Sequence, residues 1–488
     1  MNTKYNTRKI INLSFFLSLL IGILIYFSGC KEKSGTNEPI IEQPEFLSDV
    51  ALWLTLADQT VLMTKQQTEL NFGTESNNYV TIEVDSAITY QTIDGFGFTL
   101  TGGSARLINQ LDSDTKDDLL TELFSIDSNA IGISYLRISM GASDLSDEVF
   151  TYNEMPANQI DMELKYFSIE KEQTHLIPIL KKILSINPNI KIMGSPWTAP
   201  TWMKTNTSFM GGSLKPEYYD VYSNYFVKYI EAMANEGIVI DAVTIQNEPL
   251  HAGNNPSMYM EAIDQALFIK NHLGPLFESN GIKTKIIVYD HNADRPDYPI
   301  TILNDPEAAK YIDGSAFHLY GGNISALTQV HNAYPDKNLY FTEQWVGGPS
   351  IFGSDLSWHM ENLIIGATRN WSTVVLEWNL ASDPSYFPHT EGGCINCLGA
   401  ITVGNRVSRN VAYYIIAHAS KFVRPGAVRI SSSLNDNLKN VAFKTADGQK
   451  VLIVLNTSDD TESFNIKYNS KWVTTSQKSG SVGTYVWK

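Results

Sequence analysis

Short apolar runs alternate with longer amphipathic stretches between about residues 91 and 422. The runs are rich in Ile and Val and lack strict apolar–polar alternation, which is typical of strands buried on both faces. They predict eight strands, at 93–99, 133–139, 190–195, 240–246, 284–289, 315–319, 338–342 and 373–378. The stretches between them predict helices, among them 175–186, 218–235, 258–277, 355–369 and 407–422. Eight strand–helix pairs favour an α/β fold, a (β/α)8 TIM barrel, over a doubly wound open sheet.

The two flanks of this region have a different pattern. Residues 50–90 and 427–488 contain short alternating runs separated by Gly, Asn, Asp and Ser, which predict antiparallel strands. Neither flank alone is long enough to bury a core, so we expect one side β-sandwich built from both chain ends. The predicted boundaries are 49–90 for the N-terminal strands, 91–424 for the barrel and 425–488 for the C-terminal strands.

The N-terminus carries three basic residues and no acid, then an apolar run over 10–27 that ends in Ser28-Gly29-Cys30. This pattern indicates an export signal, with a short membrane span as the alternative. The small-small-Cys ending resembles a bacterial lipobox, although Phe27 stands where Leu is preferred. We therefore predict a lipoprotein signal peptide over 1–29, a lipid on Cys30, and a polar tether over 30–48. The expected location is the bacterial cell envelope, periplasmic or at the cell surface.

The composition and charge of the chain limit the classes of partner that it can bind. The chain has 488 residues, 43% of them hydrophobic, and its 36 Lys and Arg against 52 Asp and Glu give a formal charge of −16. A disordered chain is excluded, and the acidic surface disfavours nucleic acid. We expect a monomer that meets the membrane only through its lipid. Cys394 and Cys397 form a lone C-x-x-C without a His cluster, which leaves a loop disulfide or two free thiols rather than zinc.

Two acids follow apolar runs at the expected mouth of the barrel. Glu248 comes after the fourth predicted strand, and Glu343 after the seventh. Carboxylates at these strand ends face each other across a barrel mouth, as needed to flank a glycosidic bond. Aromatic residues at the ends of other strands, Trp197, Tyr320 and Trp378, offer rings on which a sugar can stack.

These motifs together resemble glycoside hydrolase family 30, which includes glucosylceramidases and endo-β-1,6-glucanases. The resemblance rests on Ser195-Pro196-Trp197, Asn247-Glu248-Pro249, Glu343 after an apolar strand, and Trp378-Asn379, in this order along the chain. It implies a retaining enzyme with Glu248 as acid/base and Glu343 as nucleophile. It further implies that the attacked sugar is held by Trp197, Asn247, His318, Tyr320 and Trp378. We expect the nearby anion of Glu343 to raise the pKa of Glu248.

One departure from the family pattern bears on the substrate. Glucosylceramidase-like members have Thr-Asp where this chain has Thr101-Gly102. Without that carboxylate, space remains beside the 6-position of the sugar, so Gly102 favours an endo-β-1,6-glucanase acting on oligo- or polysaccharide β-glucan. An exo-acting glucosylceramidase-like β-glucosidase is the alternative. A non-catalytic carbohydrate-binding surface lipoprotein is disfavoured, because it has no need for two opposed glutamates.

For three further charged residues, two interpretations stay open. Arg137 and Asp144 near the second strand, and Glu377 on the eighth, either bind sugar or orient a neighbouring loop. No zinc-protease or calcium-loop pattern occurs in the sequence, so we expect neither a metal nor a cofactor.

Overall fold

The computed structural model describes residues 48–127 and 129–488. The predicted signal peptide, Cys30 and the predicted tether up to residue 47 lie outside the described residues. Within those ranges, every helix is too short or too polar to cross a lipid bilayer.

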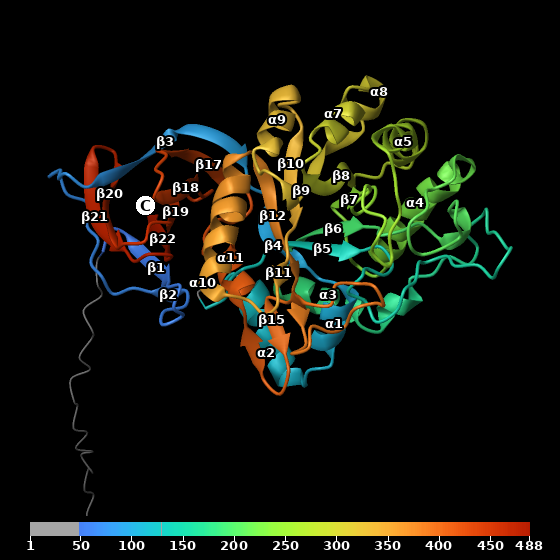
Figure 1. Cartoon of the computed structure of the whole chain (residues 1–488), viewed down its shortest axis with the longest axis horizontal. Helices are drawn as coiled ribbons and strands as arrows, with labels where there is room; N and C mark the ends of the chain where they lie inside the picture. Colours follow the sequence, from blue (N-terminus) through green and yellow to red (C-terminus); the bar gives the residue numbers. More distant parts are fainter. Residues whose placement is uncertain (1–47, 128) are drawn as a thin grey trace, which may run out of the picture. The chain divides into compact units, whose positions relative to one another are not determined.

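A closed barrel of eight parallel strands forms the centre of the described chain (Figure 1). In chain order its strands are β4 (Gly95–Thr99), β5 (Tyr135–Ser139), β6 (Lys191–Ser195), β7 (Ala242–Thr244), β8 (Lys285–Ala293), β9 (Ile312–Gly322), β10 (Asn338–Glu343) and β12 (Ser372–Asn379). Pairing of β12 with β4 closes the ring, which confirms the (β/α)8 prediction and excludes the open sheet. A buried layer of large and small side chains fills the interior, including Tyr135, Met193, Ala242 and Ile287.

Helices follow the strands and pack around the barrel (Figure 1). They are α1 (Gly102–Asn109), α2 (Ser113–Phe124), α3 (Leu176–Ile186), α4 (Tyr219–Asn235), α5 (Ala262–Phe268), α6 (Gly274–Ser279), α7 (Asp297–Leu303), α8 (Pro306–Ala309), α9 (Ala326–Ala333), α10 (Phe352–His359) and α11 (Val411–Ser420). A π-helical turn, Ile269–Leu273, joins α5 to α6, and a second, Met360–Ala367, continues α10.

The helix predicted over 407–422 is wrong at its start. Residues Val407–Arg409 form strand β16, which pairs antiparallel with β15 (Ile401–Val403). The side-chain amide of Asn410 then donates to the carbonyl of Gly399 at 2.7 Å and to Oγ1 of Thr402 at 2.7 Å. These bonds hold residue 410 to the hairpin, so the helix begins only at Val411.

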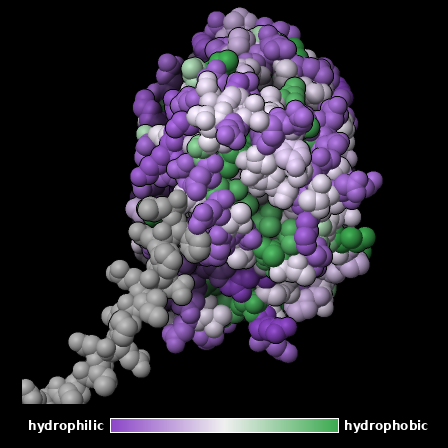
Figure 2. Space-filling view, turned by 90° about the vertical axis from the view of Figure 1, so that its left-hand side faces the viewer, coloured by the Kyte–Doolittle hydropathy of each residue, from purple (hydrophilic) through white to green (hydrophobic). Residues whose placement is uncertain are grey.

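The two flanks combine in one nine-stranded sheet, as predicted. Its order is β2 (Thr64–Lys65), β1 (Ala51–Thr55), β22 (Val482–Trp487), β19 (Lys450–Asn456), β18 (Leu438–Lys444), β17 (Val428–Ser432), β3 (Val80–Thr92), β20 (Glu462–Tyr468) and β21 (Lys471–Gln477). The sheet folds over a core that joins Ile82, Leu452, Ile466 and Tyr485, which makes it sandwich-like. Its face in Figure 2 is mostly polar with scattered apolar side chains.

The prediction that all flanking strands are antiparallel is wrong for one pair. Strand β3 pairs antiparallel with β17 but parallel with β20. The 13-residue β3 is long enough to pair with β17 over one part and with β20 over another, and the pairing with β17 contains two register shifts. The relative direction of β3 and β20 is a property of a pairing between distant segments, which an alternating pattern does not report.

Barrel and sheet share buried contacts. The rings of Phe96 on β4 and Phe443 on β18 lie 6.5 Å apart, edge to face. The buried ring of His418 on α11 bridges Oγ1 of Thr55 and Oγ1 of Thr484, each at 2.8 Å. The two parts therefore pack as one compact unit within the described residues 48–127 and 129–488.

Candidate active site

A cavity of about 340 Å³ lies where the carboxyl ends of the barrel strands meet. Six of the residues predicted to act on a sugar line it: Trp197, Asn247, Glu248, Tyr320, Glu343 and Trp378. His318 lies directly behind this lining, fully buried, and contacts Glu248. The barrel thus brings together side chains that are up to 181 positions apart in the sequence.

Gly102 is the one predicted specificity residue that does not line the cavity. It is the first residue of α1, capped by the side chain of Thr101, and its φ is not in the left-handed region. A Cβ at this position would lie 3.2 Å from Oγ of Ser146. Any effect of Gly102 on a substrate therefore has to pass through the segment that contains Ser146.

The two glutamates lie close together and are almost fully buried. Glu248 is 7% exposed and Glu343 is 6% exposed. One oxygen of each, together with a ring nitrogen of His318, lies within 4.8 Å of the others. Glu248 adopts a positive φ of 46°, a strained backbone conformation of the kind that gathers at functional sites. This spacing is closer to the carboxyl pair of a retaining glycosidase, about 5 to 5.5 Å apart, than to that of an inverting enzyme, about 6.5 to 9.5 Å apart.

A buried arginine organises the base of the cavity. Arg137 donates from Nη1 to Oε2 of Glu343 at 2.6 Å, and from Nη2 to Oδ1 of Asn247 at 2.6 Å and Oδ2 of Asp290 at 2.8 Å. Because Oδ1 of Asn247 is occupied, its amide nitrogen is left to donate to a ligand. Of the two interpretations of Arg137, the geometry supports the orienting one: it holds the nucleophile candidate and its neighbours in place.

Asp290 is the anchor of this network, and sequence reasoning missed it. It is fully buried and accepts hydrogen bonds from Arg137, His318, Thr244 and Thr342. Although burial opposes its ionisation, Arg137 and these donors hold the pKa of Asp290 well below its usual range. The rule used for the glutamates would have found it, because Asp290 directly follows the apolar run of β8.

His318 carries a positive charge between the acids. Its Nδ1 lies 3.3 Å from Oε1 of Glu248, and its Nε2 lies 3.1 Å from Oδ1 of Asp290. Burial opposes the charge, but the carboxylates of Glu343, Asp290 and Glu248 raise the pKa of His318 to about 9. Near neutral pH both ring nitrogens therefore donate, one to each acid.

The expected rise in the pKa of Glu248 is wrong. Burial raises the pKa of Glu248, but the hydrogen bond and charge of His318 outweigh it, and the net pKa of Glu248 is lowered. Burial raises the pKa of Glu343, and the charges of His318 and Arg137 only partly oppose that rise. Near neutral pH the proton of this pair therefore lies on His318, one hydrogen bond away from Glu248.

Aromatic groups form one wall of the cavity. The rings of Trp197 and Trp378 lie 5.6 Å apart, and the guanidinium of Arg137 lies 4.8 Å from the ring centre of Trp197. The indole nitrogen of Trp197 is buried without a hydrogen-bond partner among the described residues. Tyr320 donates its hydroxyl to Oε1 of Glu343 at 3.0 Å.

Glu377 does not line the cavity. Its Oε1 lies 2.7 Å from Nδ1 of His359 at the end of α10, which supports the orienting interpretation. Trp345, His251 and His291 do line the cavity, and they were not singled out from the sequence. Trp345 and His291 stand within two residues of Glu343 and Asp290, so inspection of each strand end over a few more positions would have found them.

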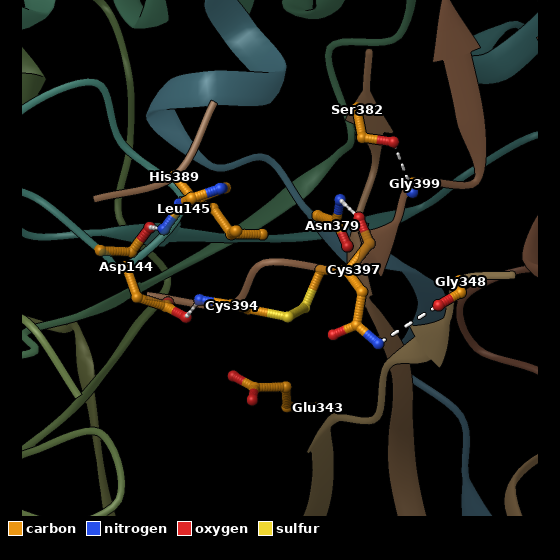
Figure 3. Close-up of a disulfide and its surroundings, with 12 residues drawn as sticks. Asp144, Leu145, Glu343, Gly348, Asn379, Ser382, His389, Cys394, Cys397 and Gly399 are labelled. Carbon is orange, nitrogen blue, oxygen red and sulfur yellow. Dashed lines mark hydrogen bonds between the residues drawn. A yellow bond between two sulfur atoms is a disulfide. The ribbon is translucent and has the colours of Figure 1, made fainter. Parts of the chain in front are cut away.

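Cys394 and Cys397 form a disulfide, with Cα atoms 5.8 Å apart, and both line the cavity (Figure 3). Cys397 lies on β14 (Cys397–Leu398), which pairs with β11 (Val346–Gly347) just after Glu343. Its side chain packs with Leu145, Trp197 and Trp378. The disulfide is therefore part of the site, beside the aromatic wall.

Comparison with known proteins agrees with this geometry. Residues 93–423 match the glycosyl hydrolase family 30 TIM-barrel domain, and residues 426–485 match the beta sandwich domain of the same family. An endo-1,6-beta-D-glucanase of Aspergillus fumigatus is 34% identical over 82% of this chain and 86% of that protein. The lysosomal acid glucosylceramidase of Mus musculus is 30% identical over 82% of each chain.

A solved structure gives the same result. The endo-beta1,6-glucanase BT3312 superposes with a TM-score of 0.84 and 37% identity, covering 90% of this chain and 99% of that one. The family matches span more than half of the chain and include both the barrel and the sheet beside it. This chain therefore belongs to glycoside hydrolase family 30.

Proposed function

We propose that this family 30 hydrolase is a retaining endo-β-1,6-glucanase that works by double displacement through a glycosyl ester on Glu343. The observation that carries the chemistry is the pair of buried glutamates within 4.8 Å in a cavity walled by tryptophans. The linkage is supported by similarity to two endo-β-1,6-glucanases at 34% and 37% identity over most of the chain.

In this mechanism Glu343 attacks the anomeric carbon while Glu248 gives a proton to the departing oxygen. The Nδ1–H of His318, 3.3 Å from Glu248, is placed to supply that proton. Once the ester forms, the negative charge of Glu343 is gone, so Glu248 more readily stays ionised and acts as base toward water. The free amide nitrogen of Asn247 donates to the 2-hydroxyl, a contact that strengthens as positive charge develops on the sugar.

A substrate screen tests the linkage. The purified protein is incubated with β-1,6-glucan, β-1,3-glucan, xylan, β-1,6-galactan and glucosylceramide, and product sizes are recorded over time. An endo-β-1,6-glucanase releases a ladder of oligosaccharides from β-1,6-glucan at early times. Release of glucose alone, or preference for glucosylceramide, would instead support the exo-acting alternative, to which the murine relative points.

The role of Gly102 in substrate choice stays a prediction. An aspartate at this position would first meet Ser146, two residues from the cavity-lining Asp144. Gly102→Asp should therefore lower cleavage within long β-1,6-glucan by roughly 10-fold or more, with less effect on an aryl β-glucoside. Equal losses on both substrates at unchanged melting temperature would remove Gly102 from the specificity argument, and Gly102→Ala controls for backbone effects.

The envelope location is the last part of the proposal. It is supported by the basic start of the chain, the apolar run and Cys30. Metabolic labelling with a lipid precursor should mark the wild type and not Cys30→Ser, which should be released as soluble enzyme or remain an uncleaved precursor. Identical labelling and fractionation of the two proteins would exclude the lipid anchor.

A further inference from the structure

His291 is a buried histidine in the cavity wall for which the mechanism above has no use. It lies on β8 directly after Asp290, lines the cavity, and is 7% exposed. Its Nδ1 is buried and has no hydrogen-bond partner within residues 48–127 and 129–488. Its Nε2 lies 4.0 Å from Oε1 of Glu248, which is too far for a hydrogen bond. The ring thus keeps hydrogen-bonding capacity that the described protein does not use.

The other buried histidines of the described chain differ from His291 in this respect. Each of His318, His359 and His418 has at least one ring nitrogen within hydrogen-bond distance of an oxygen atom. A histidine with only a structural role is satisfied in this way, because a buried polar group without a partner destabilises the fold. The position of His291 therefore calls for a partner that a ligand supplies.

The imidazole of His291 is neutral near neutral pH. Burial lowers its pKa to about 4, helped by the positive charge of His318 and opposed by the carboxylate of Glu248. A neutral ring carries one N–H, and Nδ1 has neither an acceptor nor access to solvent for it. The proton therefore belongs on Nε2, which the nearby ionised Glu248 also favours. The result is an unused N–H donor beside the acid/base candidate.

The strand order places His291 on the side of the leaving group. Its strand β8 pairs with β7, the strand that leads to Glu248, and the N–H of Glu248 donates to the carbonyl of Asp290 at 3.0 Å. The aromatic wall is elsewhere, since Trp378 lies on β12, which is next to neither β7 nor β8 in the ring. Because Glu248 gives its proton to the departing oxygen, the departing sugar lies on the same side as His291.

This side of the cavity also reaches solvent. His251 lines the cavity and is exposed, and its N–H donates to the carbonyl of Glu248 at 2.8 Å. Its charge acts on both Glu248 and His291, so the three side chains are close neighbours. An endo-acting enzyme needs such an opening beside its acid, because the departing chain extends beyond one sugar unit.

A 1,6-linkage has a particular need for a contact here. Its departing oxygen is O6, which a CH2 group joins to the sugar ring, so the linkage has one more rotatable bond than a bond to a ring carbon. This additional rotation must be fixed before Glu248 can meet the oxygen in a productive geometry. The departing ring offers hydroxyls at positions 2, 3 and 4, and each can accept from an N–H.

We propose that His291 is a specificity-determining residue of the leaving-group subsite, where its Nε2–H donates to a ring hydroxyl of the departing glucosyl unit. The inference rests on the proposed function, because it requires a sugar as the leaving group beside Glu248. It assigns a contact to the departing sugar, whereas the tryptophans and Asn247 serve the sugar that Glu343 attacks.

The test measures how the glycosyl ester on Glu343 is divided between water and a sugar acceptor. The ester is formed from an activated aryl β-glucoside in the presence of methyl β-glucoside, whose 6-hydroxyl reacts in the reverse of the first displacement. Water and the acceptor both need Glu248 as base, so the ratio of transfer to hydrolysis cancels any effect of His291 on Glu248. The ratio therefore reports binding of a sugar in the leaving-group subsite.

Three variants of His291 separate the two ring nitrogens. His291→Phe removes both and should lower the ratio roughly 3- to 10-fold, the value of one hydrogen bond between neutral groups. His291→Gln places an amide near the position of Nε2 and should restore the ratio to within about twofold of the wild type, whereas His291→Asn, with its amide near Nδ1, should resemble His291→Phe. Asp294→Asn is the control, because Asp294 is exposed and acts on His291 only through its charge, and its ratio should change by less than about 1.5-fold.

The hydroxyl that binds His291 is identified with the 2-, 3- and 4-deoxy forms of the acceptor. One of them should be a poor acceptor for the wild type, yet His291→Phe should use it within about twofold of methyl β-glucoside. A ratio in His291→Phe equal to that of the wild type would overturn the assignment, as would equal discrimination among the deoxy acceptors by both proteins. If His291→Phe does not fold, the Gln and Asn variants decide, and retention of the ratio by Asn but not by Gln would contradict a contact through Nε2.

Failure here can be told apart from failure of the proposed function. Transfer products joined through a hydroxyl other than the 6-hydroxyl would reject the 1,6-linkage, while the comparison of variants still decides the role of His291. A wild type that does not cleave the aryl glucoside rejects the proposed function and the subsite together.

Discussion

At the residue scale, the charge of each acid in or beside the cavity follows from its hydrogen-bond donors and from the charged groups around it. Four acids lie within one small volume, yet Asp290 has an arginine and a histidine, Glu343 shares that arginine, Glu248 has the histidine, and Asp144 has one backbone N–H. Burial acts on all four in the same direction, so the hydrogen-bond donors and the charges of neighbouring groups decide the difference. These different surroundings allow chemically similar carboxyl side chains to have different roles.

The glutamates should respond differently to the leaving group. Glu343→Gln removes the nucleophile, so turnover of every substrate should fall by at least about 10³-fold. Glu248→Gln should slow glucan strongly but an aryl glucoside with a good leaving group much less, because such a group departs without a proton. Steady-state kinetics on both substrates measures this, and near-normal glucan activity in either variant would contradict the assignment.

The stereochemistry of the first product checks the same pair. Two displacements at the anomeric carbon retain its configuration, so the first reducing sugar released should be the β-anomer. Proton NMR of a fresh hydrolysate detects it before mutarotation. An α-anomer formed first would contradict double displacement.

His318 should set the alkaline limb of the pH profile. Its pKa is raised to about 9, so it is protonated below that pH and loses its charge as the pH rises through 9. The proton source beside Glu248 is then lost, and kcat/KM on glucan should fall over that window. His318→Asn should lower activity at pH 7 and lack a limb near 9, and an unchanged limb in this variant would assign it to another group.

At the element scale, the close approach of two neighbouring strands limits which side chains the barrel can accommodate. Strand β4 carries Gly97 where a Cβ would lie 1.9 Å from the carbonyl oxygen of Tyr135 on β5. That contact involves backbone, which cannot move without breaking the strand pairing. Strand β4 also leads directly into Thr101 and α1, so its position bears on the cavity rim.

Gly97→Ala should therefore destabilise the protein by about 1–3 kcal/mol or more, or prevent folding. Gly73→Ala is the matched control, because a Cβ there meets nothing within 4 Å and its φ is not positive, so its change should stay within about 0.5 kcal/mol. Urea unfolding followed by fluorescence measures both. Equal stabilities would mean that β4 can shift away from β5.

At the scale of the whole molecule, barrel and sheet depend on one shared core. Phe443, Val451, Ile453 and Val482 of the sheet belong to the same buried cluster as the barrel and its helices. Separation of the two parts would expose this surface. The described chain should therefore unfold as a single cooperative unit.

Calorimetry should show one transition, and Phe443→Ala should shift it as a whole, at a cost of about 3–5 kcal/mol. Leu434→Ala, at a position 82% exposed on the same part of the chain, should change stability by less than about 0.5 kcal/mol. Two separate transitions, of which only one moves in Phe443→Ala, would show that barrel and sheet unfold independently.

The sequence alone determined the barrel, the composite sheet, and the meeting of Glu248 and Glu343 in one cavity. The reason is that alternation and apolar runs report which face of a strand is buried, and a parallel barrel gathers all carboxyl ends of its strands at one edge. Residues placed directly after a strand could therefore be assigned to that edge without knowledge of any distance.

Only the tertiary structure decided the direction of β20 against β3, the lowered pKa of Glu248, the network of Arg137 and Asp290, and the place of Asp144 against the disulfide loop. Each depends on contacts between residues 46 to 384 positions apart, as in Thr244–Asp290 and β3–β20. Periodicity is a local property and carries no information on such contacts. Charge states in a buried site follow from a few ångströms of separation, which only the folded chain sets.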